Sequence, residues 1–76
     1  MFEYNIHNEN STDIFKETCD KVEIAFPNAK KSRVFVDVDG STIQTFTQDG
    51  KDIDIFDDYD VGAVFIKSEI ELNNIF

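Results

Sequence analysis

Aspartates are the most promising functional residues of this chain, because most of them are clustered in one segment. Six of the 12 residues from Asp49 to Asp60 are aspartates, and with Asp37 and Asp39 they give eight acids against one base over residues 37–60. That segment carries −7 of the formal net charge of −9. A one-sided field of this kind steers partners of opposite sign and does not determine the fold. We therefore expect the segment to form an acidic surface.

Two of these aspartates lie in a motif with a known catalytic counterpart. Residues 34–41, Val-Phe-Val-Asp-Val-Asp-Gly-Ser, resemble the first motif of the haloacid dehalogenase-type phosphatases, an apolar strand followed by Asp-x-Asp-Gly-Thr. The resemblance implies Asp37 as nucleophile, Asp39 as general acid and Mg²⁺ as cofactor. The chain is, however, too short for the parallel-sheet core that supplies the family's later residues, and a hairpin with an Asp-Gly turn explains the same letters. We therefore predict no catalytic residue and no cofactor.

A calcium-binding loop is the other chemistry that clustered aspartates suggest. Such a loop needs oxygen ligands at positions 1, 3, 5, 7, 9 and 12 and glycine at position 6. Neither Asp52 nor Asp58, taken as the first ligand, satisfies this pattern. No dedicated metal site is predicted, and weak binding of a divalent ion at Asp57, Asp58 and Asp60 remains an alternative.

Length and composition indicate one small folded domain. A chain of 76 residues buries only about 60% of its unfolded surface, but 41% apolar residues with eight Phe are too many for a disordered acidic tail. The single cysteine, Cys19, is expected to be a buried apolar side chain. No apolar stretch suits a membrane span or a signal peptide, so we expect a cytoplasmic protein. An aspartate-rich face would be repelled by phosphate, which argues against direct contact with nucleic acid or membrane.

The elements that carry these residues follow from the apolar periodicity. Alternation from Phe2 to His7 predicts a strand, and spacings of three to four then predict a helix of about 14 residues, capped by Ser11 or Thr12 and stopped by Pro27. Further strands are expected at 33–38, 41–47, 51–56 and 63–67, and 68–71 either opens a helical turn or extends the last strand. The predicted fold class is α+β: an N-terminal strand, one amphipathic helix, and an antiparallel meander of three to four strands with the helix on one sheet face.

Asp-Gly turns at 39–40 and 49–50 predict the hairpins of the meander. We expect a two-residue loop in the first hairpin, with Val36 opposite Ile43 and with Val34, Val36 and Val38 on the apolar face that packs the helix. In the second we expect a three-residue loop with a left-handed Gly50, because a two-residue loop would put Asp54 on the apolar face. The opposite face would then show Phe35, Phe46 and Phe56 between aspartates. Either that face is exposed, or the fifth strand or the C-terminal segment folds over it.

These features predict a small acidic, non-enzymatic inhibitor. Carboxylates on alternate strand residues stand about 6.6–7 Å apart, which approximates the spacing of phosphates along a nucleic-acid strand. In composition the chain resembles the acidic decoys that phages make against restriction, CRISPR or repair enzymes, so the expected partner is a host protein with a basic, nucleic-acid-binding groove. The alternative is an antitoxin-, immunity- or adaptor-like interaction module, or a homodimer joined through the three Phe. The predicted partner-binding residues are Asp37, Asp39, Asp49, Asp52, Asp54, Asp57, Asp58, Asp60, Phe35, Phe46 and Phe56.

Overall fold

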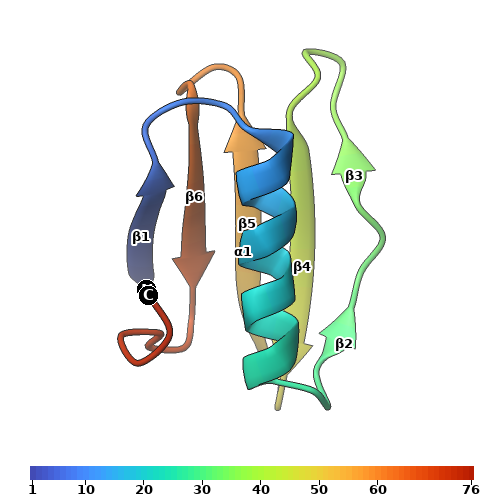
Figure 1. Ribbon diagram of the computed structural model, residues 1–76. Coiled ribbons are helices and arrows are strands. Elements are labelled where there is room, and N and C mark those ends of the chain that lie inside the picture. The colour runs from blue at the N-terminus through green and yellow to red at the C-terminus, as the bar shows by residue number, and fades with distance from the viewer.

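The computed structural model describes residues 1–76 and shows one helix packed on a six-stranded antiparallel sheet (Figure 1). The strand order is β1-β6-β5-β4-β2. Both β2 and β3 pair with β4, β2 near the end of β4 and β3 near its start. The predicted α+β class, with the helix on one sheet face, is confirmed. The elements are β1 (Phe2–His7), α1 (Thr12–Ala25), β2 (Lys30–Lys31), β3 (Phe35–Val36), β4 (Thr42–Gln48), β5 (Lys51–Asp58) and β6 (Ala63–Ser68).

Helix α1 begins and ends where the sequence predicts. Ser11 is the N-cap, and its Oγ accepts a hydrogen bond from the backbone N–H of Ile14 at 3.1 Å, which satisfies one of the free donors at the helix start. The helix ends at Ala25, two residues before Pro27, which lacks the N–H needed to continue it. Its inner side buries Phe15, Thr18, Cys19 and Val22 against the sheet.

The C-terminal segment closes the core beside the helix. Leu72 is buried, and its backbone N–H donates to the Tyr4 hydroxyl on β1 at 2.6 Å. After β6 the chain bends, because the Ser68 hydroxyl hydrogen-bonds both the N–H and the carbonyl of Ile70. Residues 69–76 consequently form bends and turns, and neither the helical turn nor the strand extension predicted for residues 68–71 is found.

Both hairpin registers differ from the prediction. The first hairpin pairs Phe35 with Ile43 across a longer turn than expected. The second pairs Gln48 with Lys51 across the two-residue turn Asp49-Gly50, where φ is +53° and +78°. Two successive positive φ angles define a type I′ turn, whose twist matches that of the flanking strands. Gly50 is left-handed as predicted, but the three-residue loop inferred around it is wrong.

Compared with the expected register, the observed one exchanges the inner and outer faces of β4. Phe46 now lies opposite Ile53 on the helix side and is only 1% exposed, so its assignment to a partner-binding face is wrong. Asp57 shares the inner face, is 3% exposed and accepts a hydrogen bond from Asn10 Nδ2 at 2.8 Å. Gln44 is also buried there, and its Nε2 donates a hydrogen bond to the carbonyl of Ser32. The inner face thus accommodates polar side chains because each has a partner, which the prediction had not allowed for.

The sheet face without the helix carries a transverse apolar row. Register places Phe35, Ile43, Phe56 and Phe65 side by side across β3, β4, β5 and β6. The Phe56 and Phe65 rings stack with centroids 4.8 Å apart. Ile70, Ile75 and Phe76 of the C-terminal segment pack instead against the core cluster that contains Phe46. The expected fifth strand, β6, pairs beside β5 within the sheet. The alternative in which the fifth strand or the C-terminal segment folds over the Phe-bearing outer face is therefore wrong.

Candidate functional site

Three connections meet at one end of the sheet, at the top of Figure 1. They are the β1–α1 loop (residues 8–11), the β3–β4 turn (37–41) and the β5–β6 loop (59–62). None of the seven Lys and Arg residues lies in them. Together with the last residue of β5 they carry five acids with solvent access, which we call the acidic tip: Glu9, Asp37, Asp39, Asp58 and Asp60.

The acidic tip is held in place by contacts between two of these connections. Ser41 is buried, and its hydroxyl accepts a hydrogen bond from the backbone N–H of Tyr59 at 2.8 Å. Gly40 has a φ of +89° and lies against the Tyr59 ring. Asp39 Oδ1 in turn accepts the backbone N–H of Ser41 at 2.9 Å. The β3–β4 turn and the β5–β6 loop therefore position their carboxylates jointly.

Three carboxylates of the tip converge. Oxygens of Asp39, Asp58 and Asp60 lie within 4.8 Å of one another. Hydrogen bonds from the backbone and side chain of Ser41 hold the pKa of Asp39 below its usual 3.8, so this group is ionised at neutral pH. Asp58 Oδ1 accepts the backbone N–H of Asp60 at 2.8 Å. Like charges at this separation favour an approaching cation, either a Lys or Arg side chain or a divalent metal ion.

The convergent set differs from the divalent-ion alternative of the sequence analysis. That alternative used Asp57, Asp58 and Asp60, but Asp57 points into the core. Asp39, from a turn 19 residues earlier than Asp58, takes its place. Sequence separation concealed this neighbour, because only the antiparallel order of β4 and β5 brings the β3–β4 turn beside the end of β5.

The strand acids do not form a free carboxylate row. Asp52 Oδ1 accepts the hydroxyl of Thr47, and Asp54 Oδ1 accepts the hydroxyl of Thr45, each at 2.7 Å. Register also places Lys67 directly beside Asp54. These hydroxyl donors already occupy one carboxylate oxygen each in the phosphate-like row expected on β5. Asp49 lies in the β4–β5 turn, at the opposite end of the sheet from the tip.

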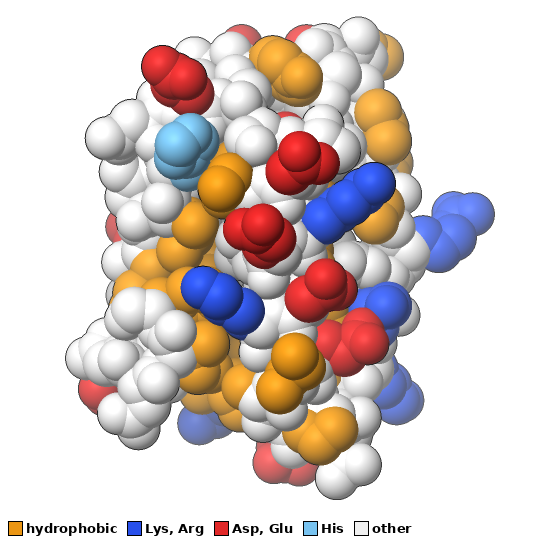
Figure 2. All heavy atoms as spheres, in the orientation of Figure 1, with side chains coloured by type: hydrophobic (Ala, Val, Ile, Leu, Met, Phe, Trp, Pro, Cys, Tyr) orange, Lys and Arg blue, Asp and Glu red, His pale blue; other side chains and the backbone are white.

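An exposed apolar strip runs along the β3 edge toward the tip. Val34, Phe35, Val36 and Val38 are 47%, 62%, 62% and 104% exposed. Hydrophobic side chains appear on the right of Figure 2, the side on which Figure 1 shows β3. Exposure of Phe35 was predicted from the sequence, but the three Val residues were expected on the core face, and that expectation is wrong. The run of bases before them, Lys30, Lys31 and Arg33, was the available signal, because charged residues commonly mark an edge strand.

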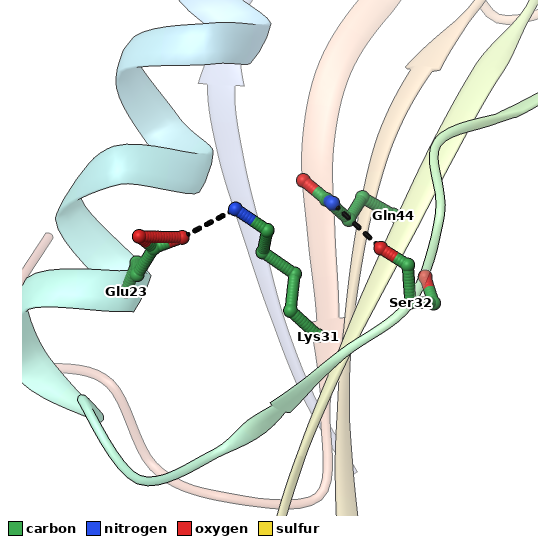
Figure 3. A network of polar contacts seen from close by, with 4 residues as sticks. All are labelled: Glu23, Lys31, Ser32 and Gln44. Carbon is green, nitrogen blue, oxygen red and sulfur yellow. Dashed lines mark hydrogen bonds and ion pairs between the residues drawn. The ribbon is translucent and has the colours of Figure 1, made fainter.

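A groove of about 280 Å³ separates α1 from this edge. Its lower end is closed by an ion pair between Lys31 Nζ and Glu23 Oε1 at 2.6 Å (Figure 3). Beside that pair, Gln44 Nε2 donates to the carbonyl of Ser32 at 2.8 Å. Burial raises the pKa of the Cys19 thiol in the groove wall to about 12, so it is not a nucleophile at neutral pH. The groove is slightly smaller than typical ligand pockets.

The segment that resembles the phosphatase motif forms an antiparallel hairpin. The sheet is antiparallel at every pairing, so it lacks the parallel core that the resemblance implies. Helix α1 is neither long enough nor apolar enough to cross a membrane. No model of a protein family matches the chain, and no curated protein or solved structure matches it either.

Proposed function

We propose that this chain is a small, non-enzymatic inhibitor that docks its acidic tip onto the basic, nucleic-acid-binding surface of a cytoplasmic protein. The observation that carries the proposal is the convergence of Asp39, Asp58 and Asp60 in a region without Lys or Arg. A guanidinium or ammonium group of the partner would enter where nucleic-acid phosphates otherwise bind.

Electrostatics explains why such a surface would bind. Each carboxylate of the tip destabilises the others until a cation approaches, so the free protein stores repulsion that the complex relieves. A pair of opposite charges about 4 Å apart near a protein surface gains roughly 4 kcal/mol before desolvation is subtracted. The net charge of −9 also accelerates encounter with a basic partner. The proposed contact surface is therefore the tip and not the strand row, whose carboxylates are hydrogen-bonded by Thr45 and Thr47.

Apolar side chains beside the carboxylates would supply part of the affinity. Tyr59 and Val61 are 50% and 67% exposed within the β5–β6 loop. Tyrosine is a frequent interface hot spot, whereas rim charges mainly set association rate and specificity. The tip thus combines an apolar anchor with an acidic surround.

Removing the tip charge tests the proposal. The variant Asp39→Asn, Asp58→Asn, Asp60→Asn keeps each Oδ1 as a hydrogen-bond acceptor and removes three negative charges. A matched control, Glu17→Gln, Asp20→Asn, Asp49→Asn, removes the same charge from exposed positions outside the tip. Each protein is immobilised and challenged with a panel of purified DNA-binding proteins at about 50 and 500 mM salt, since the Debye length falls severalfold over this range.

The expected result is capture at low salt by the parent and the control, loss of capture by the tip variant, and displacement of the captured protein by duplex DNA. Equal capture by the tip variant and its control would refute a role for the tip. Capture that DNA does not displace would refute the occupation of a nucleic-acid-binding surface.

A second candidate function, an antitoxin-, immunity- or adaptor-like interaction module, is favoured by the exposed strip at Val34, Phe35 and Val36. Such a contact would persist at high salt, because apolar burial is not screened. It would be lost in Phe35→Ala and retained in the tip variant, which separates the two candidates.

A further inference from the structure

The outer side of β3 is an open sheet edge. Phe35 pairs with Ile43, and the backbone N–H of Asp37 donates to the carbonyl of Ser41 at 2.8 Å. Residues of an antiparallel strand alternate in direction, so the backbone groups of Val36 point away from β4. Val34, outside any regular strand, makes no backbone hydrogen bond through its N–H or carbonyl. An exposed apolar edge with free backbone groups is a template for pairing with another strand.

Only the β3 half of this edge is available. The β2 half carries Lys30 and Lys31, and Lys31 is held by Glu23 (Figure 3). Lysine on an edge strand opposes pairing with another chain. The edge from Arg33 to Asp37 bears no lysine, and its side chains are exposed. An added strand would therefore lie against these five residues.

The charges on this edge are self-complementary. Arg33 and Asp37 stand two residues before and two residues after Phe35, with Val34 and Val36 between them. We propose that a second copy of this chain pairs antiparallel with the β3 edge about a two-fold axis at Phe35. Phe35 then lies opposite its symmetry mate, Val34 opposite Val36, and Arg33 opposite Asp37, and each unlike pair occurs twice.

The hydrogen-bonding direction agrees with this register. Val34 and Val36, which hold the free backbone groups, become hydrogen-bonded pairs across the axis. Phe35 opposite Phe35 and Arg33 opposite Asp37 become the closer, non-hydrogen-bonded pairs, whose side chains meet most directly. An axis at Val34 places Phe35 opposite Arg33 and Asp37 opposite Lys31, which already pairs with Glu23. An axis at Val36 places Phe35 opposite Asp37 and Arg33 opposite Asp39, which lies in the β3–β4 turn and outside the strand. Only the two-fold axis at Phe35 places Arg33 opposite Asp37 at both ends of the paired segment.

The contact is short, so the dimer is weak and reversible. Five residues on each side bury less surface than the roughly 1,200–2,000 Å² of stable complexes. Each copy also carries −9, which opposes association at long range. We expect sedimentation to show a shift from one to two chains as the concentration rises from about 10 μM to 1 mM, the range of a weak complex. A single-chain mass at every concentration would overturn the proposal.

Charge reversal tests the register. Arg33→Asp places Asp opposite Asp37 twice, and Asp37→Arg places Arg opposite Arg33 twice, so neither variant should dimerise alone. In an equimolar mixture the two variants present unlike charges at both pairs, and the heterodimer should form as readily as the parent dimer. Circular dichroism confirms that each variant is folded. A mixture that stays monomeric, or single variants that dimerise like the parent, would overturn the register.

A disulfide tests the two-fold axis independently. Phe35→Cys places two thiols across a non-hydrogen-bonded pair, where the Cβ separation of about 4.5–5.5 Å is close to that of a disulfide. Under mild oxidation this variant should form a disulfide-linked dimer at least ten times faster than Val38→Cys, a more exposed control away from the axis. Equal rates would overturn the axis at Phe35. The buried Cys19 is common to both variants.

Discussion

Phe46→Ala is the most direct test of the observed hairpin register. Phe46 is 1% exposed and belongs to the core cluster with Phe15, Ile53 and Ile55. Deleting a core Phe side chain costs about 3–5 kcal/mol, through lost burial and the cavity left behind. At about 0.05–0.15 kcal/mol per residue, a 76-residue domain has a total unfolding free energy of about 4–11 kcal/mol. The variant should therefore be barely folded.

Urea denaturation followed by circular dichroism measures this loss. Ile53→Val, opposite Phe46 in the sheet, is a milder variant that should cost about 0.5–1.5 kcal/mol and remain within the measurable range. Phe35→Ala is the surface control and should change the unfolding free energy by less than about 0.5 kcal/mol at protein concentrations where the chain is monomeric. A cost below about 1 kcal/mol for Phe46→Ala, no larger than that for Phe35→Ala, would refute the register and restore the one first expected from the sequence, which places both Phe side chains on the outer face.

Three further predictions concern single residues. Gly50→Val should lower the unfolding free energy by about 1 kcal/mol or more through backbone strain alone, because φ is +78° and an added Cβ would meet no atom within 4 Å. Thermal melting should show a drop of about 4–8 °C per kcal/mol. An unchanged melting temperature would contradict the type I′ turn. Asn10→Ala should lower the unfolding free energy measured by urea titration by about 1–3 kcal/mol, because it removes the hydrogen bond to the buried Asp57 carboxylate. Asn8→Ala, in the same loop but exposed, is its control. Cys19, whose pKa burial raises to about 12, should react with a thiol reagent at pH 8 only as fast as the domain unfolds; rapid labelling of the native protein would show that the thiol is accessible.

Local signals in the sequence determined the helix and the longer strands, but not β2 (Lys30–Lys31), for which no strand was predicted. Helix α1 follows from the Ser11 cap, the apolar spacing from Phe15 onward and the stop at Pro27, which all act within a few residues of each other. The two Asp-Gly pairs located both hairpins. The acidic character of the chain was also a property of composition, and four of the eight predicted aspartates lie at the tip: Asp37, Asp39, Asp58 and Asp60.

Tertiary structure decided the register and the faces. Asp-Gly fits both two- and three-residue hairpin loops, so the sequence left a one-residue ambiguity, and one residue exchanges the two faces of a strand. The apolar pattern selected the wrong choice because it excluded polar residues from the inner face. Asp57 is buried there only because Asn10, 47 residues away, supplies a donor. The convergence of Asp39 with Asp58 and Asp60 has the same origin, since it depends on which loops the antiparallel sheet brings to one end.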